Sequence, residues 1–507
     1  MRKFDTLVFK KGTDFMKRSS GILMPISSLP SPYGIGSLGK AAYDFADFLA
    51  EAGQKWWQVL PAGPTSMGDS PYQSFSSRAG NPYFVDLDML CEEGLLEKTE
   101  LEGIDWGDHP HYVDYGKIYE NRFTLLRKAM ERGWDKCGEK LNEFMEENAS
   151  WLFDYALFMA CKRHFGMKAW SQWPDEDIRL HKAEAVDKYA AMLEDDIKLF
   201  VFIQFLFYRQ WNALREYLHE KGLGIIGDMP IYVAMDSAEV WAEPLNFLLD
   251  EKNLPKAVSG VPPDYFSEDG QLWGNPLYRW DYMAERDYEW WMRRIEGAGK
   301  LYDVIRIDHF RAFEAYWSVP FGETTAKNGK WIEGPGMNFI GRVKERFPDM
   351  MFIAEDLGLL TDGVIKLLAD SEFPGMKVLE FAFDGGSDND YLPHNYPRNA
   401  ICYAGTHDNS TLKGWLETAG EKTLAYLRDY LGVDEKAELV WPVLRCGMAS
   451  VADLFVAQMQ DYLEKDDCAR MNTPGLASGN WRWRMDKEAI TPELTAKIKK
   501  LTKTYNR

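Results

Sequence analysis

The sequence has few of the features that mark several common protein classes. Its six cysteines lie far apart along 507 residues, without a Cys-x-x-Cys pair or the Cys/His spacing of a zinc site. No apolar run reaches the length of a membrane span, and the basic, mixed N-terminal stretch lacks the apolar core of a signal peptide. We therefore expect reduced thiols, no bound metal and a cytoplasmic location.

Positive charge is also scarce. The formal net charge is −20, and no tract of Lys or Arg stands out against it. Nucleic acids and membrane surfaces are therefore not expected as partners. Linkers, low-complexity segments and internal repeats are missing from the sequence as well. An acidic protein of this kind can still act on a neutral polymer such as a glucan.

What the sequence does contain is a series of short apolar runs, each followed by polar residues, glycine or proline. The runs are continuous rather than alternating, as in strands that are buried on both faces. The eight runs span residues 21–26, 57–61, 223–228, 304–308, 351–355, 378–382, 401–406 and 454–458. Helical patterns lie between them, for example over 41–52. The alternation predicts an α/β fold, a (β/α)8 TIM barrel. A doubly wound open sheet is the alternative, although it normally has fewer strands.

Two stretches between these runs are too long to be simple connections. Residues from about 90 to 200 have mostly helical patterns, for example over 140–161, and predict a helical insertion. A second insertion, from about 236 to 300, contains a loop over 258–275 that is rich in glycine, proline and aromatic residues. Long loops of this kind are usually functional or disordered, and the aromatics argue against disorder. We expect both insertions to pack on a single catalytic barrel unit that spans residues 1–507.

Three acidic residues, Asp308, Glu355 and Asp408, each lie at or just after the end of an apolar run. They are 47 and 53 residues apart, a spacing that fits one strand, one helix and their loops. Such spacing predicts three carboxylates at the C-terminal rim of one parallel barrel. Arg306 would point to the same side as Asp308 and keep that carboxylate ionised, as a nucleophile requires. Apolar residues before Glu355 would raise its pKa, as a general acid requires.

The residues alone leave other roles open for these carboxylates. Each could cap the following helix or pair with a nearby arginine. Clustered carboxylates also bind Mg²⁺, although no ligand motif supports a metal site here. The third possibility is the cleavage of a glycosidic bond, which requires two carboxylates. Asp408 comes with His407 in a Gly-Thr turn, where Asp408 could bind sugar hydroxyls.

Nine short segments, taken in order, narrow these alternatives. They span residues 27–36, 68–74, 80–82, 227–231, 260–264, 270–276, 306–311, 354–358 and 405–409. Together they resemble the 4-α-glucanotransferases of glycoside hydrolase family 77, which are called amylomaltases or disproportionating enzymes. The resemblance extends from Gly21 to about Arg484, over nearly the whole chain. One position departs from the family pattern: Arg78 precedes Ala-Gly-Asn-Pro, where members often have an aromatic or aliphatic residue.

The resemblance implies a (β/α)8 barrel with inserted subdomains, no separate C-terminal β-domain, and a retaining transglycosylation without a cofactor. Asp308 would be the nucleophile, Glu355 the general acid/base and Asp408 the transition-state stabiliser. The substrate-binding residues that it implies are Ser70, Tyr72, Asp228, Tyr265, Trp273, Asn275, Arg306 and His407. The substrates would be α-1,4-glucans and maltooligosaccharides, with glucose as an acceptor, and the protein would be a monomer or a weak homodimer.

Two other functions stay open at this point. A retaining α-glucan hydrolase would use the same carboxylates, and a glucan-binding barrel without activity would keep the same fold. Transfer requires that sugar reach the covalent intermediate before water does. The loop around Tyr265, Phe266 and Trp273 could exclude water from the cleft, or its aromatics could merely hold the loop on the barrel.

Overall fold

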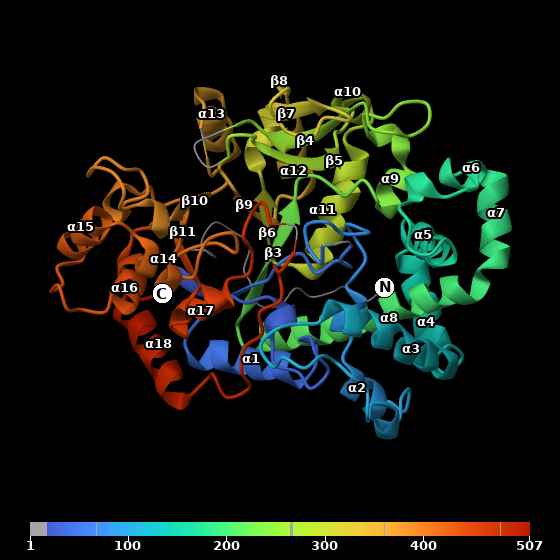
Figure 1. Cartoon of the computed structure of the whole chain (residues 1–507), viewed down its shortest axis with the longest axis horizontal. Helices are drawn as coiled ribbons and strands as arrows, with labels where there is room; N and C mark the ends of the chain where they lie inside the picture. The colour runs from blue at the N-terminus through green and yellow to red at the C-terminus, as the bar shows by residue number, and fades with distance from the viewer. Residues whose placement is uncertain (1–17, 67, 264–266, 359, 477) are drawn as a thin grey trace.

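Eight parallel strands form the centre of the molecule (Figure 1). The computed structural model describes residues 18–66, 68–263, 267–358, 360–476 and 478–507. In these residues the strand order is β10-β11-β12-β1-β2-β3-β6-β9, and every neighbouring pair is parallel. The strands are β1 (Ser19–Leu23), β2 (Trp56–Gln58), β3 (Gly224–Pro230), β6 (Val304–Asp308), β9 (Met351–Ala354), β10 (Gly375–Val378), β11 (Ala400–Tyr403) and β12 (Leu454–Gln458).

The two ends of this sheet meet. The backbone N–H of Ala354, in β9, donates a 3.0 Å hydrogen bond to the carbonyl of Pro374, just before β10. Strand order around the sheet therefore follows chain order, as it does in a (β/α)8 barrel. The fold class expected from the alternation of apolar runs is confirmed.

Burial on both faces explains why the strand sequences are continuous apolar runs. Side chains from all eight strands fill the barrel interior, among them Leu23, Trp56, Ile226, Val304, Ile353, Met376, Tyr403 and Val456. A second and larger cluster lies between the strands and the surrounding helices, with Trp57, Ile305 and Phe455 among the strand residues. Because alternate residues of one strand enter different clusters, both sides of the sheet exclude water.

Helices surround the barrel (Figure 1). The first is α1 (Lys40–Glu51), close to the helix expected over 41–52. The helices after the third barrel strand are α9 (Ala238–Ala242), α10 (Trp280–Ala284), α11 (Glu289–Leu301), α12 (Gly336–Arg346), α13 (Asp362–Ser371), α14 (Leu412–Thr418), α15 (Glu421–Leu431), α16 (Val440–Ala449), α17 (Met459–Tyr462) and α18 (Pro492–Thr504). No helix of the described residues is long and apolar enough to cross a membrane.

The chain segment that connects β2 to β3 forms a group of helices, to the right in Figure 1. They are α2 (Leu87–Glu92), α3 (Tyr115–Gly133), α4 (Gly138–Glu147), α5 (Leu152–His164), α6 (Glu176–Arg179), α7 (Ala183–Met192) and α8 (Glu194–Glu220). The helical pattern over 140–161 is interrupted at Asn148. Its side chain donates to the Phe144 carbonyl and accepts from the Trp151 indole, which ends α4 and starts α5 in a new direction.

Two expectations about strands were wrong in their details. The sixth run, 378–382, lies mostly in a 3-10 turn (Leu379–Phe381), and the strand β10 precedes it. The loop expected over 258–275 contains two antiparallel strands, β4 (Ala257–Val261) and β5 (Gln271–Pro276). With β7 (Ala315–Pro320) and β8 (Lys330–Glu333) they form a small sheet of order β5-β4-β7-β8, at the top of Figure 1.

Candidate active site

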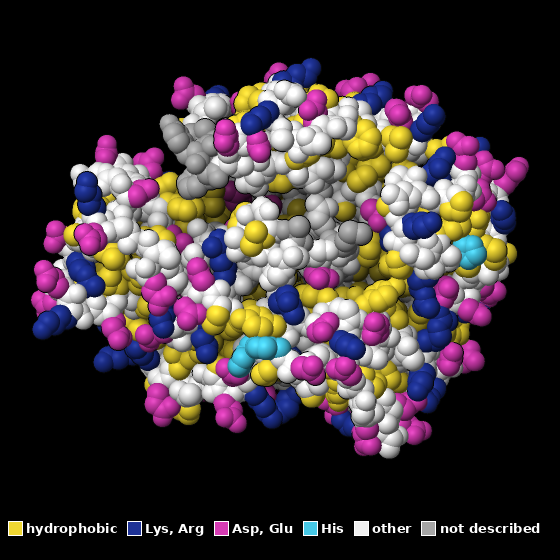
Figure 2. Space-filling model, viewed as in Figure 1, with side chains coloured by type: hydrophobic (Ala, Val, Ile, Leu, Met, Phe, Trp, Pro, Cys, Tyr) yellow, Lys and Arg dark blue, Asp and Glu magenta, His cyan; other side chains and the backbone are white. Residues whose placement is uncertain are grey.

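The ends of neighbouring barrel strands bring the predicted carboxylates together. Asp308 is the last residue of β6, and Glu355 directly follows β9, the neighbour of β6 in the sheet. Asp408 lies in a turn that begins after β11. The charge of Asp308 acts on the pKa of Glu355, and the charge of Asp408 acts on the pKa of Asp308. Figure 2 shows that this face of the molecule is hollowed near its centre, with acidic side chains visible in the hollow.

Arg306 is the central cation of the site. Its Nη1 donates to both carboxylate oxygens of Asp228, each at 2.7 Å, and to Asp308 Oδ1 at 3.0 Å. Asp228 and Arg306 are directly paired residues of β3 and β6, so the sheet register places one beside the other. Burial disfavours the charged guanidinium, but Asp228 and Asp308 hold the pKa of Arg306 well above its usual value.

Tyr72 and His407 continue this network towards Asp408. The Tyr72 hydroxyl donates to Asp228 Oδ2 at 2.8 Å and lies 3.2 Å from His407 Nδ1. The two rings are stacked with centroids 4.9 Å apart. The Oγ of Ser70 accepts from the Tyr72 amide at 3.3 Å, which stabilises the turn that carries the tyrosine. Ser70 thus acts on the site through Tyr72 in this structure.

The carboxylate of Asp408 is held by two neighbours. His407 Nε2 lies 3.3 Å from its Oδ1, and the amide of Asn472 donates to the same oxygen at 2.6 Å. Burial opposes ionisation of Asp408, but His407 and Asn472 lower its pKa below the usual range. In turn, Asp408 raises the pKa of His407 against the effect of burial. Asn472 was not identified from the sequence, because it follows no predicted strand.

Both oxygens of Glu355 accept hydrogen bonds from backbone amides. Oε2 accepts from His309 at 2.7 Å and Oε1 from Leu357 at 2.8 Å. Burial raises the pKa of Glu355 to about 7, and the charge of Asp308 adds to this, while the two amides and Arg306 act in the opposite direction. The raised pKa expected from its apolar neighbours is confirmed.

Asp308 differs from its expected electrostatics. Burial raises its pKa to about 6, because the loss of hydration outweighs the nearby Arg306 guanidinium. Arg306 acts on this pKa in the expected direction, but burial has the larger effect. The two carboxyl groups act on each other, and both have pKa values close to neutral. Near neutral pH the pair therefore holds one anionic and one protonated carboxyl group.

The small sheet forms a wall beside Glu355. Trp273, in β5, contacts the His309 ring edge to face, with centroids 4.8 Å apart. Burial lowers the pKa of His309 to about 3, so this imidazole is neutral. Asn275, also in β5, is buried; its amide donates to the Val233 carbonyl at 2.9 Å, and its side-chain oxygen faces Ser259 Oγ at 3.4 Å. Asn275 therefore attaches the small sheet to the segment after β3. Tyr265 lies outside the described residues.

Comparison with known proteins identifies the family. The family described as 4-alpha-glucanotransferase matches residues 24–490. The chain belongs to this family. A 4-alpha-glucanotransferase of Clostridium butyricum is 49% identical over 488 residues, which cover 96% of this chain and all of that protein. Another, from Streptococcus pneumoniae serotype 4, is 46% identical and covers 97% of this chain and 98% of its own length.

A solved structure supports the same conclusion. The amylomaltase from Streptococcus agalactiae, in complex with acarbose, superposes with a TM-score of 0.95 at 45% sequence identity. The match covers 97% of this chain and 100% of that one. The resemblance stated from nine short segments is confirmed, and so is the function at the level of the family. The roles of individual residues stay predictions, as does the division into one unit with two insertions.

Arg78, which precedes the Ala-Gly-Asn-Pro segment of this 4-alpha-glucanotransferase-family chain, lies in the protein interior. The Arg78 side chain packs beside Gly297 of α11. Burial lowers the pKa of Arg78, whereas the carboxylates of Glu239 and Glu243 favour its charged form. The backbone carbonyl of Arg78 accepts a hydrogen bond from the Tyr208 hydroxyl at 2.5 Å. Arg78 thus belongs to the packing between the segment that carries Tyr72 and the surrounding helices.

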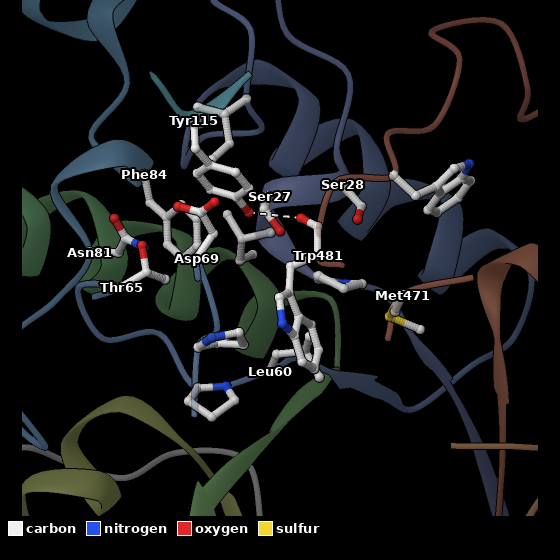
Figure 3. Close-up of a pocket in the computed structure, with 16 residues that line it drawn as sticks. Ser27, Ser28, Leu60, Thr65, Asp69, Asn81, Phe84, Tyr115, Met471 and Trp481 are labelled. Carbon is white, nitrogen blue, oxygen red and sulfur yellow. Dashed lines mark hydrogen bonds between the residues drawn. The ribbon is translucent and has the colours of Figure 1, made fainter. Parts of the chain in front are cut away.

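An open pocket lies next to the site (Figure 3). Its walls include Ser27, Asp69 and Tyr115, and Trp481 forms the side towards the carboxylates. The Trp481 ring has centroid distances of 5.6 Å to Tyr72 and 5.9 Å to His407, and its carbonyl accepts from the Tyr115 hydroxyl at 2.7 Å. The sequence contains no motif that predicts this role of Trp481.

Proposed function

We propose that the protein transfers a segment of an α-1,4-glucan to the 4-hydroxyl of an acceptor glucose or glucan, by a retaining double displacement. The observation that carries this proposal is the unequal pair of carboxyl groups. Asp308 bonds to the Arg306 guanidinium, whereas burial and the charge of Asp308 raise the pKa of Glu355 to about 7. A retaining glycosidase needs one carboxylate as nucleophile and one protonated acid beside it.

In the first step, Asp308 attacks the anomeric carbon of the donor sugar. Glu355 gives its proton to the departing glycosidic oxygen, so that the leaving glucan departs as an alcohol. The product is a β-linked glucosyl-enzyme and a shorter glucan. Arg306 orients the attacking carboxylate through its bond to Asp308 Oδ1. Asp408 binds the sugar hydroxyls most strongly as the ring approaches the oxocarbenium-like transition state.

In the second step, the 4-hydroxyl of the acceptor replaces the leaving glucan. Glu355, now a carboxylate, takes the proton from this hydroxyl as its oxygen attacks the anomeric carbon. The bond to Asp308 breaks and the nucleophile is restored. Two inversions give net retention. Because Glu355 is alternately acid and base, a pKa near neutral suits both steps.

We assign the preference for a sugar acceptor over water in the second step to the small sheet, which forms a wall beside Glu355. Trp273 contacts the ring of His309, whose amide bonds to Glu355, so that both rings lie close to the proposed acid/base. Apolar ring faces there favour a sugar ring and exclude water. We extend this assignment to maltooligosaccharides and longer α-1,4-glucans as substrates.

Incubation with maltotriose tests the proposal. Transfer gives glucose together with a ladder of maltooligosaccharides longer than the substrate. A retaining hydrolase would give only shorter sugars, and a glucan-binding barrel would leave maltotriose unchanged. NMR of the elongated products checks retention, because a retaining transfer makes every new linkage α-1,4. The monomer or weak dimer and the cytoplasmic location expected from the sequence stay predictions.

A further inference from the structure

We propose that Arg470 is a positioning residue, which holds Asp408 and Asn472 in the arrangement that the transition state requires. The proposal depends on the role assigned to Asp408 under the proposed function. Arg470 comes from the segment between α17 and α18, and nothing in the nine family-like segments includes it. Its guanidinium bonds to the backbones of Asp408 and Asn472. The side chains of these two residues meet at Asp408 Oδ1, to which Arg470 does not bond.

Three different nitrogens of Arg470 are used in this contact. Nη2 donates to the backbone carbonyl of Asp408 at 2.7 Å, and Nη1 donates to Ser410 Oγ at 3.2 Å. Nε donates to the backbone carbonyl of Asn472 at 2.8 Å. One planar group therefore binds both the turn that carries Asp408 and the segment that carries Asn472. Fixing the guanidinium plane fixes the distance between the two segments.

The two segments meet at the carboxylate of Asp408. Asn472 donates from its side-chain amide to Asp408 Oδ1 at 2.6 Å, and its backbone N–H donates to the His407 carbonyl at 3.2 Å. A shift of Asn472 would therefore move the donor that holds the carboxylate. Because Arg470 bonds to the backbone of both partners, it governs this donor and its acceptor at once.

Asp408 needs such support because the nearest strand, β11, does not fix its position. It lies five residues beyond the end of β11, in a turn. By contrast, Asp308 ends a strand that is paired on both sides, so the sheet itself positions it. A misplacement of about 1 Å in an active site can cost about 10²-fold in rate. Loss of the hydrogen bonds from Arg470 should therefore lower the turnover rate measurably.

Arg470 is itself held in place by acidic groups behind the turn. Ser410 Oγ, which accepts from Arg470, donates to Asp467 Oδ2 at 3.1 Å. Asp467 also accepts from the backbone amide of Thr411 at 2.9 Å. The charge of Arg470 acts on Glu380, which is buried behind Gly405. The Asp467 carboxylate favours a cation at this place, whereas Glu380 keeps its proton because burial raises its pKa. A neutral side chain therefore cannot replace Arg470 equally.

The test compares Arg470→Met and Arg470→Lys with Arg428→Met, using maltotriose as substrate. Arg428, in α15 and outside the site, is a matched control. Its guanidinium also donates to two backbone carbonyls, those of Asp434 and Ala437. We expect kcat to fall about 10- to 100-fold in both Arg470 variants, with KM within about 3-fold of the original protein. Lysine keeps the charge but not the three-way geometry, so it should not restore kcat. The control should keep kcat.

Double variants separate positioning from general destabilisation. If Arg470 acts through Asp408, then Arg470→Met added to Asp408→Asn should lower kcat by less than about 2-fold, because the group to be positioned is already lost. If Arg470→Met lowers kcat by the same factor in the Asp408→Asn background as in the original protein, the proposal is wrong. Unchanged kcat in Arg470→Lys, or an equal loss in Arg428→Met, would also overturn the proposal. If Arg470→Met does not fold, as judged by its melting curve, the lysine variant decides. An original protein that forms no ladder would instead refute the proposed function itself.

Discussion

The backbone N–H of His309 donates a 2.7 Å hydrogen bond to Oε2 of Glu355. His309 has a left-handed backbone with φ of 56°, a conformation that non-glycine residues rarely adopt. This conformation occurs at the first position after β6, directly beside the end of β9. The end of one strand thus holds the acid of its neighbour, and local strain is placed where orientation matters for the chemistry.

The acid role of Glu355 predicts a substrate-dependent loss. Replacement of Glu355 by Gln should lower kcat on maltotriose about 10²- to 10⁴-fold, because the departing glucan can no longer be protonated. A donor with a leaving group that needs no proton, such as α-glucosyl fluoride, should keep a fast release of fluoride in this variant. Fluoride release in the presteady state measures the first step alone.

Replacement of Asp308 by Asn is the control for that experiment. Without the nucleophile, fluoride release should be lost together with the activity on maltotriose. If Glu355→Gln were equally inactive with both donors, the proton-transfer role of Glu355 would be wrong. If Asp308→Asn released fluoride at the original rate, another group would have to be the nucleophile.

The carboxyl pair predicts a bell-shaped pH profile of kcat/KM. Activity should rise as pH increases through about 6, because Asp308 must lose its proton to attack. It should fall as pH increases through about 7, because Glu355 must keep its proton to act as acid. The two apparent pKa values belong to the pair rather than to each residue. In Glu355→Gln with the fluoride donor, the alkaline limb should disappear, and its persistence would contradict the assignment.

Trp273 offers a test of how water is excluded. Replacement of Trp273 by Ala removes the edge-to-face contact with His309 and opens the wall beside Glu355. We expect the ratio of hydrolysis to transfer on maltotriose to rise several-fold, measured as reducing ends formed against longer oligosaccharides. Trp331, in β8 of the same small sheet and 40% exposed, is the control. An unchanged ratio in Trp273→Ala, or an equal rise in Trp331→Ala, would refute this role.

Glu380 predicts a change in how stability depends on pH. Burial holds its pKa well above the usual 4.5, so the folded protein keeps a proton that the unfolded chain releases. Its contribution to stability is therefore complete below about pH 4.5 and is lost as pH rises, by up to about 1.4 kcal/mol per pH unit. Glu380→Gln should remove this loss, so that its melting temperature gains on that of the original protein from pH 5 to pH 8. A constant difference would show that Glu380 ionises normally.

The barrel could be predicted because its strands are buried on both faces. Each strand then becomes a continuous apolar run, and carboxylates directly after such runs stand out, as at Asp308 and Glu355. Strand β10 was misplaced because the apolar residues around Leu379 and Phe381 continue past the strand into a turn, where they are packed against the barrel. The strands β4 and β5 were missed because their glycines and prolines are typical of loops.

The site was only partly predictable for a different reason. Asn472 meets Asp408 from 64 residues further along the chain, and neither it nor Arg470 follows a strand or belongs to a recognisable local pattern. Their roles depend on how two turns face each other, which is a property of the folded chain alone. The pKa of Asp308 could not be foreseen either, because the extent of its burial outweighs the charge two positions before it.

The pairing of Asp228 with Arg306 constrains how this protein can change over generations. The two side chains are almost completely buried and face each other across β3 and β6. Loss of either one removes the doubly bonded partner of a buried charge, and breaking such a pair typically costs about 3 to 5 kcal/mol. A lineage cannot therefore drift at one position first and repair the other later. Substitutions at these two positions should be found together in natural variants or not at all, so that the pair is inherited as one unit.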